Sequence, residues 1–254
     1  MKKRLTRRQF FAGAAGVSIS AATAITAGRL ASKHGLIPPD HDGLFGIETS
    51  LTYAAQRLLL HNQQLAREFR PDQISSNFPA INTVMPESES YRRDIPVGFR
   101  NWRLIVDGLV ARPSEFSLED LRRFPSRTQI TQHVCEQGWS AIAEWTGVPL
   151  SVVLQSVGIQ SAAKYIFFTS VDDWWDSIDM ADAFHPQTLL AYGMNGGDLP
   201  IPHGAPVRLR VERQLGYKHL KFLSTVTVTD SAAEWGEGKG SQGAENGYSW
   251  YAGI

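Results

Sequence analysis

The sequence predicts an α+β fold in which strands outnumber a few short helices. Short runs of β-branched and aromatic residues recur along the chain, separated by turns rich in glycine and proline. Residues 221–228 alternate regularly between the two faces of a strand, whereas long helical spacing is confined to 50–69. With 254 residues, the chain is long enough for one large domain with its own core.

The first predicted element is an amphipathic helix over 50–69. Its apolar residues recur at helical spacing, and they are Leu51, Ala54, Ala55, Leu58, Leu59, Leu65 and Phe69. Pro71 ends this helix because proline cannot donate the next backbone hydrogen bond. Residues 75–99 carry repeated prolines and no helical period, so we expect an extended but ordered loop there.

The remainder is read as strands joined by short helices. One helix spans 117–125, with Ser117 as its N-cap and Asp120 at the third helical position. Another begins at Pro149 and ends at Gly158. The tail, 234–254, is rich in glycine but keeps aromatic residues, so we expect it to pack on the body. The expected strands are 102–108, 128–134, 164–170, 188–200 with a glycine-rich turn, 205–212 and 220–230.

Charge is concentrated at the N-terminus. Residues 1–29 hold six of the 25 basic residues and none of the 25 acidic ones, which leaves 19 basic against 25 acidic residues in the remainder. That balance argues against a nucleic-acid-binding protein, which needs clustered lysine and arginine.

The basic start is followed by an apolar run from Phe10 to Ala27, the pattern of a signal peptide. Arg7 and Arg8 within "TRRQFF" resemble a twin-arginine export signal. We therefore expect a signal peptide over 1–31 and a periplasmic location, with an uncleaved membrane anchor or a basic tail as alternatives. A linker and the helix would follow over 32–76, and the main domain over 77–254.

Cys135 is the only cysteine of the chain. A single cysteine cannot form an intramolecular disulfide, so it is a packing residue, a nucleophile or a metal ligand. A hydrolase would need a histidine acting as base toward this thiol, and His133 is two residues away.

Three blocks of sequence, in this order, resemble the molybdopterin-binding domain of the sulfite oxidase family. They are "CEQGWSAIAEWTGVPLSVVL" from residue 135, "LLAYGMNGGDLPIPHGAPVRLRV" from residue 189 and "GYKHLKFLSTVTV" from residue 216. The resemblance implies an irregular, strand-rich mixed α+β fold that holds a molybdenum–molybdopterin cofactor. It also implies that Cys135 is the catalytic cysteine bonded to molybdenum. A soft thiolate suits a metal that is already held by sulfur.

The same resemblance implies the residues that hold the rest of the cofactor. His203 and Arg208 would contact the pterin and its phosphate, and His219, Leu220 and Lys221 would meet the phosphate end. A buried phosphate needs charge-assisted donors, which arginine and lysine supply. Asn77, Ala80 and Ile81 in "SNFPAIN", and Ser170 at the end of a strand, are further expected contacts. Trp174 and Trp175 are expected as one rim and one core residue.

The predicted function is two-electron oxygen-atom transfer on a small sulfur-containing substrate. No haem-binding segment is evident, so a haem protein, either a membrane b-type or a periplasmic c-type cytochrome, would exchange the electrons. His203 matches the His-Gly-x-Pro form of sulfite oxidases, where the exported methionine sulfoxide reductases have asparagine. An arginine-rich pocket would favour sulfite, and an aromatic pocket a neutral sulfoxide. A non-catalytic binding protein with this fold and a cysteine hydrolase using Cys135 are the alternatives.

Overall fold

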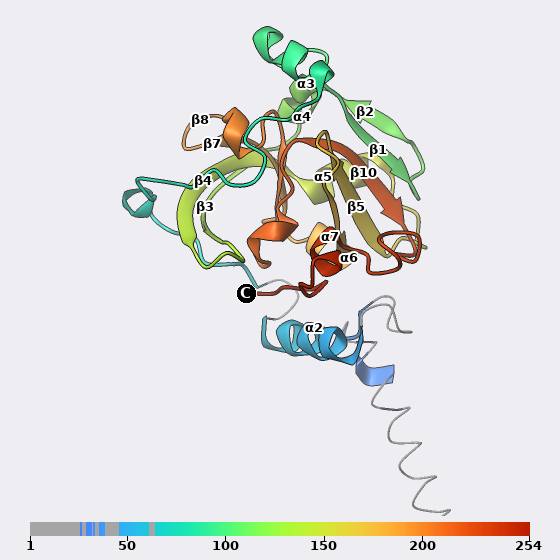
Figure 1. Cartoon of the computed structure of the whole chain (residues 1–254). Coiled ribbons are helices and arrows are strands. Elements are labelled where there is room, and N and C mark those ends of the chain that lie inside the picture. Colours follow the sequence, from blue (N-terminus) through green and yellow to red (C-terminus); the bar gives the residue numbers. More distant parts are fainter. Residues whose placement is uncertain (1–25, 27–28, 32, 34–35, 39–45, 61–63) are drawn as a thin grey trace, which may run out of the picture.

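A computed structural model gives the fold and describes residues 26, 29–31, 33, 36–38, 46–60 and 64–254 (Figure 1). Most of the predicted signal peptide and linker therefore lies outside the described residues. Within the described part, no helix is both long and apolar enough to cross a lipid bilayer.

Two five-stranded sheets form the body. The first has the order β2 (Ser114–Phe116), β1 (Leu104–Gly108), β10 (Leu223–Thr229), β5 (Tyr165–Ser170) and β6 (Trp175–Asp179). Only its β1–β10 pair is parallel, and its other pairs are antiparallel. The last strand along the chain, β10, lies between β1 and β5. The predicted strands at 102–108, 164–170 and 220–230 are confirmed, whereas β2 and β6 were not predicted.

The second sheet supports the candidate site. Its order is β3 (Arg127–Val134), β4 (Ser140–Pro149), β7 (Leu189–Met194) and β8 (Gly197–Asp198), and β9 (Arg208–Arg210) also pairs with β7. All of these pairs are antiparallel. The predicted glycine-rich turn is the β7–β8 turn, where Asn195 and Gly196 have positive φ. Sequence reasoning missed β4.

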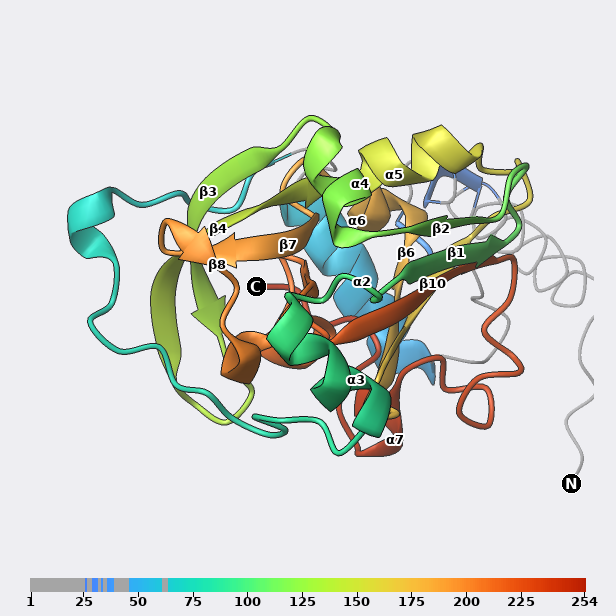
Figure 2. The ribbon, with the colours of Figure 1, turned by 90° about the horizontal axis from the view of Figure 1, so that it is seen from above.

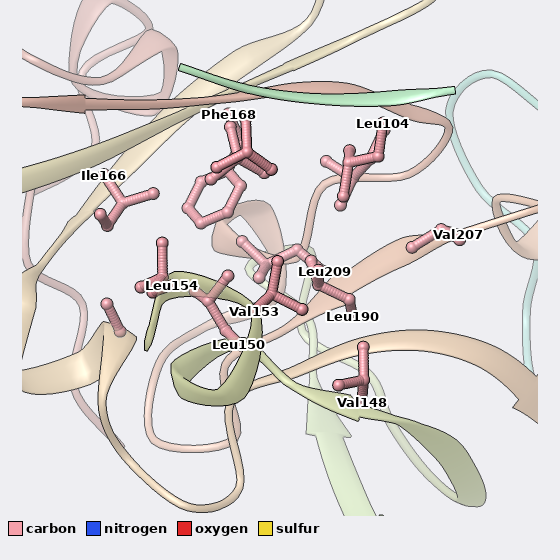
Figure 3. Close-up of a cluster of buried hydrophobic side chains, with 14 of the residues drawn as sticks. Leu104, Val148, Leu150, Val153, Leu154, Ile166, Phe168, Leu190, Val207 and Leu209 are labelled. Atoms are coloured by element: carbon pink, nitrogen blue, oxygen red, sulfur yellow. The ribbon is translucent and has the colours of Figure 1, made fainter. Parts of the chain in front are cut away.

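The main core lies between the two sheets and helix α5 (Leu150–Val157). Figure 3 shows side chains from α5 pointing toward residues of both sheets, among them Leu104, Ile166, Phe168, Leu190 and Leu209. These residues are fully buried. Figure 2 shows α5 on one side of the molecule and the β3–β4 turn, α3 (Glu89–Asp94) and α7 (Gln242–Glu245) on the opposite side.

The residues predicted to begin or end two helices are confirmed. In α4 (Leu118–Arg123) the Ser117 hydroxyl accepts from the Asp120 N–H, and the Asp120 carboxylate accepts from the Ser117 N–H. Pro149 precedes α5, and Gly158, with φ of 76°, ends it. The predicted packing of the tail on the body is also confirmed, because Trp250 and Tyr251 are buried.

The predicted helix 50–69 is only partly correct. Helix α2 spans Gly46–Leu60, and residues 64–70 run extended, with Glu68 bridging to Thr131 and the Phe69 N–H donating to the Ile130 carbonyl. The expected apolar face is also not the buried one: Tyr53 and Arg57 are buried, while Leu58 is exposed. A second error concerns 75–99, which contains α3, capped by the Ser88 hydroxyl.

Candidate active site

Cys135 lies at the start of the turn between β3 and β4. Its N–H donates to the Trp139 carbonyl at 2.9 Å, and its carbonyl accepts from the Gly138 N–H at 3.1 Å. Gly138 has a φ of 89°, which favours glycine, so this residue allows the chain to close the turn. Cys135 lines a pocket between this turn and the loops around it, and only 3% of the residue is exposed.

Among the residues that the structure describes, no histidine forms a hydrogen bond with the thiol. The Cys135 thiol donates to a Glu136 carboxylate oxygen at 3.6 Å and accepts from the Gln137 N–H at 3.5 Å. Burial raises the pKa of the Cys135 thiol, whereas a reactive cysteine nucleophile requires a lowered pKa. The His133 Nδ1 accepts from Arg210, so Nε2 carries the ring proton and cannot take a proton from the thiol, as a cysteine hydrolase would need.

Arg208 is a buried cation with no acidic partner among the described residues. Its two terminal nitrogens donate to the carbonyls of His203 and His219 at 3.0 Å, and its Nε has no hydrogen-bond partner. Burial and the neighbouring Arg210 lower the pKa of Arg208. An isolated buried charge is costly, so this guanidinium is suited to an anion brought in from outside.

Lys221 is a half-buried cation that also lacks an acidic partner among the described residues. Its ammonium group contacts the carbonyls of Ile81, Thr83 and Pro202, which ties the loop of residues 78–83 to the pocket. Burial and Arg208 lower the pKa of Lys221 to about 8. Gly204 allows this approach, because a Cβ there would lie 2.8 Å from the Lys221 Cβ.

Two neighbouring cations are instead neutralised internally. Lys218 donates to Asp176 at 2.5 Å, and Arg210 makes a two-pronged pair with Glu212 at 2.9 and 2.7 Å. These residues are buried and already paired, so they contribute structure rather than an anion site.

Arg210 also fixes His133 on the pocket wall. Arginine only donates, so the His133 Nδ1, 3.0 Å from the Arg210 guanidinium, must accept and the ring proton lies on Nε2. The Nε2 faces Gly216, where a Cβ would lie 2.7 Å from it. Burial, followed by Arg210 and Arg208, lowers the pKa of His133 well below its usual value.

His203 and His219 are also held neutral. Burial is the largest cause in both cases, and it lowers the pKa of His203 to about 4 with help from Arg208 and Lys221. His219 contacts the Gln214 carbonyl through Nε2 at 3.0 Å, while its buried Nδ1 has no partner. His219 thus keeps a buried acceptor without a partner, and Arg208 keeps a buried Nε donor without one.

The outer wall of the pocket is aromatic and acidic. Tyr217 and Tyr248 stack with ring centroids 5.1 Å apart, and Phe78 meets Trp139 edge-on at 5.9 Å. Trp174, 41% exposed, lies at the rim. Glu136 and Asp172 add carboxylates to the lining, and apart from histidines its basic residues are Arg208 and Lys221, among the residues that the structure describes.

The structure brings together most, but not all, of the expected site residues. Cys135, Ala80, Ile81, His203, Arg208, His219, Leu220 and Lys221 line one pocket. Asn77 is exposed and Ser170 is buried against Asp172 and the Trp174 carbonyl, and neither is among the lining residues. Trp174 and Trp175 divide as expected, because Trp175 packs in the core against Phe167 and Trp235.

Sequence reasoning missed the pocket roles of Phe78, Tyr217 and Tyr248. Phe78 is adjacent to the Asn77 that was singled out, and Tyr217 lies inside the "GYKHLKFL" block, so both had a signal in their neighbours. Tyr248 had none, because its placement depends on the tail folding back over the pocket.

The comparison with known families decides the identity. Residues 92–235 match the family described as oxidoreductase molybdopterin binding domain. The chain belongs to this family. Its cofactor is therefore molybdenum–molybdopterin, and the protein is a molybdopterin-binding oxidoreductase with the sulfite oxidase-type fold. The pocket segments 78–83 and 243–248 lie outside the matched region.

Two named relatives support the family assignment. The chain is 38% identical over 189 residues to "Putative protein-methionine-sulfoxide reductase subunit YedZ1" of Azospira oryzae, covering 73% of this chain and 70% of that protein. It is 30% identical to the protein-methionine-sulfoxide reductase catalytic subunit MsrP of Ralstonia nicotianae, over 60% of this chain and 50% of that protein. The match thus spans half the length of this MsrP.

A solved structure is also similar. The sulfane dehydrogenase SoxCD from Paracoccus pantotrophus superposes with a TM-score of 0.50 at 29% identity, over 52% of this chain and 39% of that one.

The residues present fit the family's cofactor. Arg208 and Lys221 are cations without carboxylate partners, His219 and Arg208 keep unused polar atoms, and the Cys135 thiol opens onto the same space. In the described part of the chain, no group of three or more His, Cys, Asp or Glu side chains could hold a metal ion.

Proposed function

We propose that this protein is the catalytic subunit of an exported sulfoxide reductase that converts a thioether sulfoxide, such as methionine sulfoxide, to the thioether. The observation that carries the proposal is the lining of the pocket. Aromatic side chains surround the entrance, and the carboxylates of Glu136 and Asp172 accompany them. An anionic substrate such as sulfite would be repelled there, whereas a neutral sulfoxide with an apolar side chain would pack on the rings.

The residues divide into cofactor-holding and substrate-facing groups. Arg208 and Lys221 would neutralise the phosphate of the cofactor, His203 and His219 would contact its polar edge, and Cys135 would bind the metal through its thiolate. When bound, the molybdenum cofactor supplies the two-electron oxygen-atom transfer. His133 stays a neutral donor because Arg210 occupies its other nitrogen.

The electrons and protons that the reaction consumes must come from outside the pocket. Reduction of one sulfoxide consumes two electrons and two protons and yields one thioether and one water. We assign the electrons to a separate haem protein, either a membrane b-type or a periplasmic c-type cytochrome. The relatives' names, which call YedZ1 a subunit and MsrP a catalytic subunit, support a second component. Arg7, Arg8 and the apolar segment that follows support twin-arginine export to the periplasm.

Dye-linked turnover tests the proposed activity. Protein purified from a host that makes molybdopterin is mixed with reduced benzyl viologen, and dye oxidation is followed with free methionine sulfoxide, oxidised peptides and dimethyl sulfoxide. Sulfite with ferricyanide is run in parallel, and Cys135→Ser is the control. We expect sulfoxide-dependent oxidation of the dye. Sulfite-dependent reduction of ferricyanide without sulfoxide turnover would contradict the proposal, and molybdenum-loaded protein without either activity would favour a binding protein.

A further inference from the structure

Helix α2 is attached to the body by its polar side. The Arg57 guanidinium pairs with Asp179 at 2.8 Å and with Asp182 at 3.1 Å, and all three side chains are buried. The Tyr53 hydroxyl donates to Asp179 at 2.5 Å. These contacts fix which way the helix faces, because turning it would leave buried charges without partners.

The opposite side of α2 is apolar and exposed. Leu51, Leu58 and Leu59 are 65%, 69% and 74% exposed, and they follow each other at helical spacing. The other exposed residues among the described side chains of this helix are Thr52 and Ala55, so the described exposed side chains carry no charge. We call Leu51, Thr52, Ala55, Leu58 and Leu59 the leucine face. Figure 1 shows α2 at the edge of the molecule, with both sheets on one side of it.

The size of the leucine face limits what can cover it. Three leucines supply on the order of 300–400 Å² of apolar surface, less than the roughly 800 Å² that each partner buries in a standard protein interface. A second copy of the chain or a protein partner would therefore need further contacts. A lipid bilayer needs no shape complementarity, and inserting the leucine side chains into it removes their apolar surface from water.

The chain that precedes α2 favours the same occupant. Eighteen residues, 28–45, separate the end of the apolar segment Phe10–Ala27 from Gly46, the first residue of the helix. A chain of this length keeps α2 close to any membrane that holds the segment. We propose that the leucine face of α2 inserts into the surface of a lipid bilayer and orients the protein on the membrane. The proposal does not depend on which substrate the pocket reduces.

A fluorophore on α2 tests the proposal in the full chain. Thr52→Cys places a thiol within the leucine face, while the native Cys135 is buried and labels poorly. The label is an environment-sensitive dye, and the probe is vesicles of phosphatidylethanolamine and phosphatidylglycerol. The matched control is Glu119→Cys, labelled in the same way on the exposed surface of α4. We expect emission at Thr52→Cys to move to shorter wavelength with vesicles, and emission at Glu119→Cys to stay unchanged.

Leu58→Glu/Leu59→Glu, added to Thr52→Cys, should reduce the spectral change at least tenfold. The same label with Leu65→Glu, an exposed leucine outside the helix, should keep it. Because the replaced leucines are exposed, each variant should unfold at the parent's temperature, which is checked by circular dichroism.

Two results would overturn the proposal. One is a Thr52→Cys label that does not respond although the chain sediments with the vesicles, since the N-terminal segment alone would then be the anchor. The other is a spectral change that appears without vesicles as protein concentration rises, which would assign the face to a second copy of the chain.

Discussion

The two arginines that flank Leu209 should respond in opposite ways to the same substitution. Arg208 and Arg210 both lie over the Trp145 ring, with their guanidinium carbons 5.1 and 4.2 Å from its centroid. Arg210 is paired with Glu212, whereas Arg208 donates only to two carbonyls. Methionine has similar length and no charge, so Arg208→Met and Arg210→Met are matched perturbations.

The expected stabilities follow from these partners. Arg210→Met leaves the Glu212 carboxylate buried without a cation, which costs about 3–5 kcal/mol. Arg208→Met loses two hydrogen bonds of about 1 kcal/mol each and a ring contact of roughly 0.5–2 kcal/mol. Removing a buried unpaired charge stabilises the folded state by several kcal/mol, which offsets these losses. The free energy of unfolding without cofactor should therefore change by no more than about 1 kcal/mol.

Cofactor retention should show the opposite pattern, with Arg208→Met the more damaging of the two substitutions. Losing a charge-assisted contact to a buried phosphate costs about 2–5 kcal/mol, or a roughly thirtyfold to several thousandfold weaker hold. Urea unfolding of protein made in a host without molybdopterin measures the first quantity, and molybdenum per chain from a competent host measures the second. The reasoning is refuted if Arg208→Met destabilises the cofactor-free protein as much as Arg210→Met does while its molybdenum content stays at the parent's level.

Three further predictions concern acid stability, substrate and export. Because the pKa of His203 is about 4 in the folded protein, below its usual 6.5, the folded state binds fewer protons and stability should fall as pH drops from 6.5 to 4. His203→Gln should flatten that fall in urea titrations; an unchanged slope would count against a neutral His203. Trp174→Ala should raise KM for a sulfoxide roughly twofold to tenfold with kcat nearly constant, and a fall in kcat alone would remove Trp174 from substrate binding. Arg7→Lys/Arg8→Lys should leave folded, molybdenum-loaded protein in the cytoplasm, and undiminished periplasmic protein on fractionation would contradict twin-arginine export.

The sequence predicted features whose causes are local. Ser117 and Asp120 cap α4 because the two residues satisfy each other's backbone groups, and Pro149 and Gly158 bound α5 for equally local reasons. The site blocks around Cys135, Arg208 and Lys221 could be placed in one pocket because the family resemblance supplied their relationship, not because any local pattern did.

Features that depend on distant partners could not be predicted. The spacing of leucines in α2 indicates an apolar face, but the buried side is decided by Arg57 meeting Asp179, 122 residues away. The neutral form of His133 depends on Arg210, 77 residues away, and the aromatic wall depends on the tail bringing Tyr248 onto Tyr217. Asn77 and Ser170 were expected from the family resemblance and their spacing to Cys135, and they are not among the residues that line the pocket.

The central claim is that the Cys135 thiolate is a molybdenum ligand, and X-ray absorption at the molybdenum edge tests it most directly. The measurement compares the parent with Cys135→Ser, both isolated with cofactor bound. Serine is nearly the same size, and the cofactor would be held mainly by Arg208, Lys221 and the histidines, so much of the pterin should remain. A hard oxygen then replaces a soft sulfur, so turnover should be lost. We predict one fewer sulfur ligand per molybdenum in Cys135→Ser than in the parent. An unchanged sulfur count, or full activity in the variant, would contradict the claim and make Cys135 a packing residue.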